Sequence, residues 1–341
     1  MTNKNMHWTD DSQEKPFPFL LKPVGKDYLW GGSRLKDDFA KEVPISPLAE
    51  TWECSVHPDG PSMVASGSFC GKSLAEVILE HPEYMGGRYA GKKEFPVLIK
   101  LIDARESLSI QVHPDDDYAA KHENGALGKT EMWYVLDASE NSEVILGFRR
   151  NIKKEHLKSI LESGRIEQYL QKVKICKDDI FLVKAGTVHG IGAGSLIAEV
   201  QENSNITYRL YDYNRTSKDG KKRKLQVDKA VNVIRIEEDE TTNQRMRVLK
   251  YSRGCAEELL CRCRYFQVGR LIVYTERHRE MYQLETDCDS FQVLLCIGGC
   301  GTVFGESGHW VHFIKGDCIF VPAGSGLLRI HGRAQILKVT C

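Results

Sequence analysis

The chain alternates between short apolar segments and turn-forming residues along most of its length. Apolar runs or alternating apolar and polar positions, bounded by glycine, proline or aspartate, predict strands. Such segments occur at residues 95–104, 107–114, 131–138, 142–148, 178–186, 195–203, 291–299, 309–317, 318–324 and 335–341. Many short strands of this kind favour a mainly β barrel or jelly roll over a fold of alternating strands and helices.

Helical patterns are few. Ser73 is placed to cap a helix over LAEVILEHP, with Glu76 as its capping-box partner. Residues 152–172 carry apolar side chains at helical spacing, and Gly164 divides them into two predicted helices. Residues 226–235 predict a further helix.

One segment of the chain has a counterpart further on. Residues 179–189 align without gaps on residues 317–327, each an acidic turn, a short apolar strand and then Ala-Gly followed by Ser or Thr. This repeat predicts two related barrels. The last position differs, because it is His189 in the first copy and Leu327 in the second. A ligand held through that histidine would bind to the first copy alone.

Composition excludes several classes of protein. The 341 residues contain 47 Lys and Arg against 47 Asp and Glu, so no net charge attracts nucleic acid or anionic lipid. No apolar run reaches the ~18 residues of a membrane span, and the polar N-terminus has no apolar signal core, which favours the cytoplasm. The eleven cysteines lack zinc-finger spacing and are expected to be free thiols.

Four side chains near predicted strand ends suggest a metal site. Gln111 and His113 are two residues apart on a strand and therefore share a face. Glu131 begins another strand, and His189 lies at a strand-to-turn junction between glycines. Two imidazoles, a carboxylate and a carboxamide suit zinc with an open position, and iron(II) also accepts two histidines with one carboxylate. Taken singly, each could instead be a turn or strand-end residue.

The segment 206–215, ITYRLYDYNR, carries an arginine inside a strand pattern. Alternation would place Thr207, Arg209, Tyr211 and Tyr213 on one face. A fixed cation on a largely apolar face is costly unless it meets an anion or a developing charge. A structural ion pair is the alternative interpretation of Arg209. The other histidines, including His309 and His312, are interpreted as surface or core residues.

These motifs, in this order, resemble the class I mannose-6-phosphate isomerases, and in particular their shorter bacterial form. The resemblance is carried by QVHPDDDYA, ENGALGKTEMWYVL, AGTVHGIG and TYRLYDYNR, with support from LKPVGKDYLWGG, ETWECSVHPDG and FPVLIKLIDA. It covers about residues 20–341 and is thin after residue 255. Four ordered motifs make it specific, whereas QVHP alone would not.

The resemblance implies a cupin fold, with one metal-bearing barrel, a second barrel without metal, and a helical insertion. The expected parts are a flexible extension at 1–17, a catalytic metal-binding domain at 18–250 with its insertion around 152–172, and a cupin-like domain at 251–341. The implied zinc ligands, one ion per chain, are Gln111, His113, Glu131 and His189. Arg209 would be the active-site arginine, and Lys129 would handle substrate.

The implied reaction interconverts mannose 6-phosphate and fructose 6-phosphate, so the expected partner is a small sugar phosphate. Such an isomerisation moves a proton between C1 and C2 through a cis-enediol and needs a base and stabilisation of oxyanion charge. Lys129, Asp212, a zinc-bound water and a non-ligating histidine are all possible bases. A cupin iron(II) dioxygenase is one alternative function, and Arg209 and the four ordered motifs argue against it. A sugar-binding module without turnover is the other; loss of Glu131 or Arg209 would have favoured it, and neither is lost.

Overall fold

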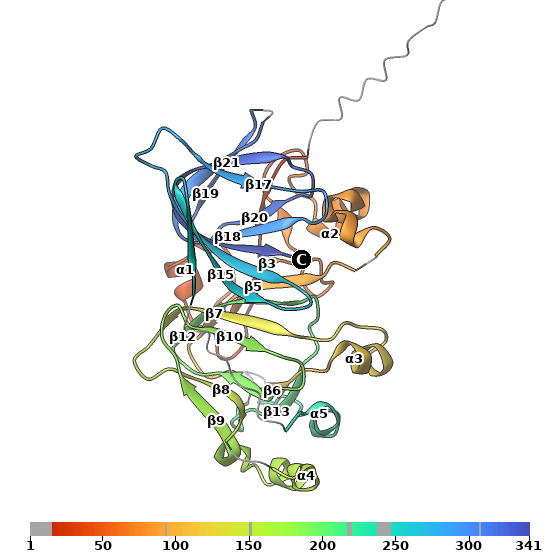
Figure 1. Ribbon diagram of the computed structural model, residues 1–341. Helices are drawn as coiled ribbons and strands as arrows, with labels where there is room; N and C mark the ends of the chain where they lie inside the picture. Colours follow the sequence, from red (N-terminus) through yellow and green to blue (C-terminus); the bar gives the residue numbers. More distant parts are fainter. Residues whose placement is uncertain (1–15, 93, 150–151, 217–219, 237–246, 307) are drawn as a thin grey trace, which may run out of the picture.

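A computed structural model describes residues 16–92, 94–149, 152–216, 220–236, 247–306 and 308–341. All but the last two residues of the predicted N-terminal extension lie outside these ranges. The described strands form three antiparallel sheets and far outnumber the helices (Figure 1), so the mainly β prediction is confirmed. Within the described residues, no helix is long and apolar enough to cross a membrane.

Two of the sheets are formed by strands that lie between residues 24 and 211. The six-stranded sheet has the order β10-β7-β12-β5-β3-β2. Its strands are β2 Val24–Lys26, β3 Glu50–Cys54, β5 Val97–Ala104, β7 Glu131–Ala138, β10 Ile180–Val183 and β12 Ser195–Glu202. The five-stranded sheet has the order β13-β6-β11-β8-β9. Its strands are β6 Ile110–Val112, β8 Glu143–Phe148, β9 Leu170–Lys174, β11 His189–Ile191 and β13 Tyr208–Tyr211.

The third sheet has ten strands and joins the two ends of the chain. Its strands are β1 Phe19–Lys22, β4 Met63–Val64, β14 Leu249–Ser252, β15 Cys255–Arg262, β16 Gln267–Tyr274, β17 Tyr282–Glu285, β18 Gln292–Phe304, β19 Trp310–Ile314, β20 Cys318–Val321 and β21 Leu327–Thr340. β1 pairs with β20, and β4 pairs with β1. β1 and β4 therefore lie in the sheet formed by the C-terminal strands β14–β21, which we call the C-terminal sheet. The division of domains at residue 250 and the two cupin barrels stay predictions.

The sheets are stacked, and apolar side chains fill the space between them. Along β5, Ile99 and Leu101 pack toward the ten-stranded sheet, whereas Ile102 packs toward the five-stranded sheet. Side chains of a strand alternate between faces, so one buried strand supplies both cores. The outer face of the five-stranded sheet is covered by α4 Lys154–Glu162 and α5 Val227–Val233 (Figure 1).

Some helices agree with the sequence and others do not. Ser73 caps α2 Leu74–Glu80 through a complete capping box with Glu76, and α5 lies within the predicted 226–235. The first helix of 152–172 is α4. The second is wrong, because only a 3₁₀ turn at Ile166–Tyr169 follows Gly164, and Leu170 begins β9. Pairing of β9 with β8 overrides the helical spacing. The remaining helical segments, α1 Arg34–Asp37, η1 Pro82–Met85, η2 Gly87–Tyr89 and α3 Asp116–His122, were not predicted.

The internal repeat is present as a repeated unit of structure. Asp179 and Asp317 precede β10 and β20, and each carboxylate accepts a hydrogen bond from the backbone N–H three residues earlier, at 2.8 Å. After the Ala-Gly turn, β11 begins at His189 and β21 begins at Leu327. The two aligned positions therefore have the same place in both units.

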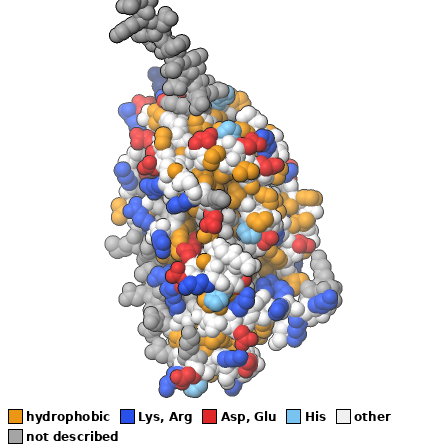
Figure 2. All heavy atoms as spheres, turned by 90° about the vertical axis from the view of Figure 1, so that its right-hand side faces the viewer, with side chains coloured by type: hydrophobic (Ala, Val, Ile, Leu, Met, Phe, Trp, Pro, Cys, Tyr) orange, Lys and Arg blue, Asp and Glu red, His pale blue; other side chains and the backbone are white. Residues whose placement is uncertain are grey.

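Figure 2 shows the side of the molecule that bears α2 and α3. Acidic and basic side chains are interspersed across that face (Figure 2), in keeping with the equal numbers of the two in the sequence. All eleven cysteines are free thiols.

Candidate active site

The candidate site lies where the six-stranded and five-stranded sheets face each other. β6 and β11 belong to the five-stranded sheet, and His189 is the register partner of Gln111. Glu131 begins β7, which belongs to the six-stranded sheet. Ile110 and Val112 pack into the outer cluster under α4 and α5. Gln111 therefore faces inward, as the alternation predicts.

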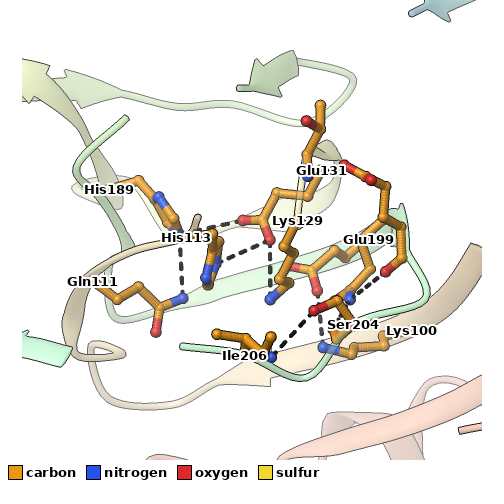
Figure 3. Close-up of polar contacts among 12 residues, drawn as sticks. Lys100, Gln111, His113, Lys129, Glu131, His189, Glu199, Ser204 and Ile206 are labelled. Atoms are coloured by element: carbon orange, nitrogen blue, oxygen red, sulfur yellow. Dashed lines mark hydrogen bonds and ion pairs between the residues drawn. The ribbon is translucent and has the colours of Figure 1, made fainter. Parts of the chain in front are cut away.

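The ligand atoms of His113, Glu131 and His189 all lie within 4.8 Å of one another. Each imidazole Nε2 is 3.4 Å from an oxygen of Glu131, Oε2 for His113 and Oε1 for His189. Gln111 Nε2 lies 3.2 Å from His189 Nε2, and Lys129 Nζ lies 3.2 Å from Glu131 Oε2. Figure 3 shows these side chains converging from both sheets. The structure thus brings together the four predicted ligands and Lys129.

Burial and charge set the protonation of the three central groups. Burial, followed by the charge of Lys129, lowers the pKa of His113 to about 3. Burial also lowers the pKa of His189. Burial by itself would raise the pKa of Glu131, but Lys129 and the two imidazoles lower it well below its ordinary value. The site therefore offers two neutral imidazoles and one carboxylate, which are the forms that bind metal ions.

The residues fit a metal ion because several of their buried polar atoms lack hydrogen bonds. Both ring nitrogens of His113 and both carboxylate oxygens of Glu131 are buried without a hydrogen-bond partner. Leaving such atoms unsatisfied is costly in the absence of a ligand. His189 Nδ1 lies 2.9 Å from the carbonyl oxygen of Thr187, which fixes the tautomer with the Nε2 lone pair toward Glu131. A half-turn of the Gln111 amide would present its oxygen in place of its nitrogen.

A cavity of about 250 Å³ opens beside these groups. Gln111, Lys129 and Arg209 line it, together with Thr207 and Gln226. The Arg209 side chain donates to Ser109 Oγ at 3.2 Å and to the Lys224 carbonyl oxygen at 3.1 Å. Neither acceptor is a carboxylate, so the guanidinium keeps its positive charge available to the cavity. These contacts are not the structural ion pair that was the alternative interpretation of Arg209.

Charged residues that the sequence interpretation missed also line the cavity. Lys100 Nζ lies 3.1 Å from Glu199 Oε1 and 3.9 Å from Glu50 Oε2, and all three side chains are buried (Figure 3 shows Lys100 and Glu199). Burial, followed by the charge of Glu131, raises the pKa of Glu199. Trp133 Nε1 donates to Glu199 Oε2 at 3.1 Å. The signal was a charged residue inside each of two largely apolar strands, Lys100 in FPVLIKLIDA and Glu199 in SLIAEVQEN.

Asp212, one of the possible bases, is held by two arginines. Arg215 donates to its Oδ1 at 2.5 Å, and Arg223 donates to Oδ1 at 2.5 Å and to Oδ2 at 2.8 Å. Burial alone would raise the pKa of Asp212, but these hydrogen bonds lower it. Arg223 also lines the cavity, whereas Asp212 is not among its lining residues. Burial and the neighbouring Arg223 lower the pKa of Arg209.

The sequence is similar to known isomerases over almost its whole length. Residues 19–149 match the family model for the catalytic domain of phosphomannose isomerase type I. The chain is 37% identical over 324 residues to the Bacillus subtilis mannose-6-phosphate isomerase ManA, covering 94% of this chain and 98% of the relative. It is also 46% identical over 219 residues to the probable mannose-6-phosphate isomerase GmuF of the same organism, covering 64% of this chain and 69% of the relative.

Solved structures share the fold. The mannose 6-phosphate isomerase of Bacillus subtilis matches with a TM-score of 0.86 at 35% identity, covering 95% of this chain and 99% of that one. A putative mannosephosphate isomerase from Archaeoglobus fulgidus has a TM-score of 0.73 at 23% identity, covering 96% and 98% of the two chains, which shows the fold alone.

The fold, the clustered histidines and carboxylate, and these similarities define the class of the protein, which is an isomerase. More narrowly, the chain belongs to the type I mannose-6-phosphate isomerase family.

Proposed function

We propose that this chain interconverts mannose 6-phosphate and fructose 6-phosphate, and that His113, Glu131, His189 and Gln111 hold one Zn²⁺ for that reaction. The observation that carries the proposal is the position of the buried His113–Glu131–His189 cluster beside a cavity lined by Lys100, Lys129, Arg209 and Arg223. A sugar phosphate is anionic, so a cationic cavity next to a metal-binding cluster suits it.

The donor set supports zinc in particular. Imidazole nitrogens and a carboxylate oxygen are common zinc ligands, and no thiolate lies in the cluster to weaken its Lewis acidity. Gln111 would add a neutral oxygen. When bound, zinc would polarise the substrate oxygens near the reacting carbons.

The reaction would pass through a cis-enediol or enediolate, with negative charge developing on O1 and O2 of the sugar. Lys129 and Arg209 are fixed cations on the cavity wall, Lys129 by Glu131 and Arg209 by Ser109 and Lys224. Donors fixed in advance stabilise such charge without having to reorganise, and each typically contributes about 10²–10³-fold. We assign this role to both residues, with Arg209 and Lys129 also binding the substrate.

The proton that moves between C1 and C2 needs a base on the cavity wall. Asp212 suits this role poorly, because its lowered pKa and two arginine partners make it a weak base. No histidine is among the described residues that line the cavity. Glu199 does line it, and burial raises its pKa, which makes it a stronger base than an ordinary carboxylate. We assign the proton transfer to Glu199.

The phosphate would bind at Arg223. Arg223 lines the cavity, and Asp212 orients its guanidinium through two hydrogen bonds. Burial, followed by the charge of Arg223, lowers the pKa of Arg209, so a dianionic phosphate on Arg223 would offset the repulsion between the two cations.

A coupled assay tests the proposal. Fructose 6-phosphate formed from mannose 6-phosphate should be detected with the purified chain, should disappear after exhaustive chelation, and should return on addition of Zn²⁺. Metal content per chain should be close to one zinc. Absence of fructose 6-phosphate with a fully zinc-loaded chain would refute the activity, and full activity after complete metal removal would refute the zinc requirement.

A further inference from the structure

The segment Gly128–Thr130, which carries Lys129 and leads into β7, is held by its backbone. Gly128 N donates to Asp116 Oδ1 at 2.9 Å, and Thr130 N donates to Glu202 Oε2 at 2.6 Å. Between them, Lys129 N donates to the Pro114 carbonyl oxygen at 3.0 Å. Three consecutive amides are therefore bound by two separate parts of the chain, residues 114–116 and Glu202, and the two amides that flank Lys129 are bound by carboxyl groups.

The two carboxyl groups line the same cavity and are close enough for a hydrogen bond between them to shift both pKa values. Such a bond requires one of the two to carry a proton. Burial, and after it the charge of Asp116, raises the pKa of Glu202 to about 8. Burial alone would raise the pKa of Asp116, but its hydrogen bonds lower it. The shared proton therefore belongs to Glu202 at neutral pH.

The C-terminal part of the chain reaches the same pair. Tyr265, in the turn between β15 and β16, donates its hydroxyl to Asp116 Oδ2 at 2.9 Å. Asp116 is the first residue of α3, and Glu202 is the last residue of β12. Three elements that are distant in the sequence thus meet at the segment that carries Lys129.

These carboxyl groups do not line the cavity beside the histidines. Asp116, Glu202 and Tyr265 line a different cavity of about 500 Å³. Gly128 shows how tightly the segment is packed, because a Cβ added there would lie 2.5 Å from the Asp116 backbone nitrogen. The pair is therefore placed to act on the reaction through the backbone that it holds, without touching the substrate.

We propose that Asp116 and Glu202 form a proton-sharing pair of positioning residues, which fixes Lys129 and the start of β7 with Glu131 for catalysis, and that the C-terminal sheet contributes to the active site through Tyr265. This inference rests on the proposed function for the roles of Lys129 and Glu131. The positioning itself rests on the hydrogen bonds described above.

A consequence for pH follows from the shared proton. Above about pH 8, loss of the Glu202 proton would place two carboxylates side by side and loosen the segment. The charged and titratable groups that face the pair are those of its cavity and of the β15–β16 turn, namely Tyr89, Lys92, Glu94, Cys263, Arg264 and Tyr265. None of them lies between Glu202 and the Thr130 amide, which are 2.6 Å apart.

The experiment compares Glu202→Gln with Glu202→Ala in the zinc-loaded full-length chain. Glutamine can accept from Thr130 with its oxygen and donate to Asp116 with its amide, so it needs no shared proton. At pH 7 we expect Glu202→Gln to keep kcat within about threefold of the parent, and Glu202→Ala to lose about 10²-fold, as small displacements of catalytic groups do. The alkaline decline of kcat in the parent should be weakened or absent in Glu202→Gln.

A second readout does not depend on activity. Amide hydrogen exchange of residues 128–131 should be faster in Glu202→Ala than in the parent and unchanged in Glu202→Gln. If the parent lacks isomerase activity, the proposed function fails, while exchange still tests the positioning. If the parent is active and Glu202→Ala matches it in kcat and in exchange, this inference is overturned.

Tyr265→Phe is a second test of the inference, for the case that Glu202→Ala does not fold. It removes a single hydroxyl from the C-terminal sheet and leaves the ring in place. We expect kcat to fall several-fold with little change in KM, and exchange at residues 128–131 to increase. Unchanged kcat and unchanged exchange would show that the C-terminal sheet does not contribute to the active site through Tyr265.

Discussion

The carboxylate of Glu131 lies 3.4 Å from the imidazole of His189, although their strands, β7 and β11, belong to different sheets. His113, which follows β6 of the five-stranded sheet, is equally close to the other oxygen of Glu131. A metal ion held by all three would therefore join the two sheets. Its binding energy would add to the free energy of unfolding, because an unfolded chain cannot present the ligands together.

Metal removal should accordingly destabilise the protein. A ligand present at 100 times its Kd stabilises by about 2.7 kcal/mol, which corresponds to a shift in Tm of about 4 °C for a chain of this size. We expect the chelated chain to melt lower by this amount and to recover on addition of Zn²⁺. Equal melting temperatures with and without metal, measured by calorimetry, would show that no ion bridges the sheets.

His189→Ala should lose metal and activity together, because one of three central ligands is removed. Zinc per chain, measured by elemental analysis after dialysis, should fall well below one, and fructose 6-phosphate formation should fall to background. His312→Ala is the matched control, since His312 lies in β19 and contacts Thr302 Oγ1 at 2.6 Å. It should change neither quantity. Retention of tightly bound zinc by His189→Ala would argue against the ligand set.

Arg209→Ala should keep the metal but lower kcat by about 10²–10³-fold, because a fixed cation is removed from the developing charge. Arg209→Lys should recover only part of that loss, since lysine cannot reproduce the two guanidinium contacts with Ser109 and Lys224. Arg329→Ala, in β21 of the ten-stranded sheet, is the control and should behave like the parent. Near-parental kcat in Arg209→Ala, with zinc content unchanged, would refute the assigned role.

Arg223→Ala should weaken binding of the phosphate group. We expect the KM for mannose 6-phosphate to rise at least tenfold, which is about 1.4 kcal/mol of lost binding, while any turnover of unphosphorylated mannose stays as in the parent. Asp212 keeps its bond to Arg215 in this variant, so the local structure has a remaining anchor. An equal loss with both sugars would instead indicate a general structural effect.

Glu199→Gln should lower kcat by at least about 10²-fold, as expected for loss of a general base. Because burial raises the pKa of Glu199, the parent should lose kcat on acidification at a higher pH than an ordinary carboxyl group would cause. The base must be deprotonated to work, so the loss runs toward low pH. If Glu199→Gln keeps the parental kcat and the same decline toward low pH, Glu199 is not the base.

The sequence predicted the site better than it predicted the helices. Gln111 and His113 share a face because strand alternation is rigid, and the structure confirms that Ile110 and Val112 pack on the opposite side. The helical spacing after Gly164 misled, because pairing of β9 with β8 is a long-range effect that local periodicity does not contain. Strands β15 and β16, eight residues each, were not predicted. Their sequences do not alternate regularly between apolar and polar residues.

The charged residues that line the cavity could not be predicted from any single segment of the sequence. Lys100 and Glu199 lie on neighbouring strands as register partners, and that pairing sets one charge against the other. Local sequence shows only a lysine inside one largely apolar strand and a glutamate inside another, and it does not show that these two strands pair. The repeat gave firmer information, because the same strand–turn–strand unit recurs with His189 at one copy and Leu327 at the other.

The pairing of β1 with β20 has a consequence for biogenesis. Phe19 and Phe320 are register partners, so β1 finds its neighbour only after the strands between them in the sequence have been synthesised. Contacts of such long sequence separation form slowly. Phe19 and Leu21 are buried in the folded protein, so they lack this cover until β20 has been made, and transiently exposed apolar surface of this kind favours aggregation.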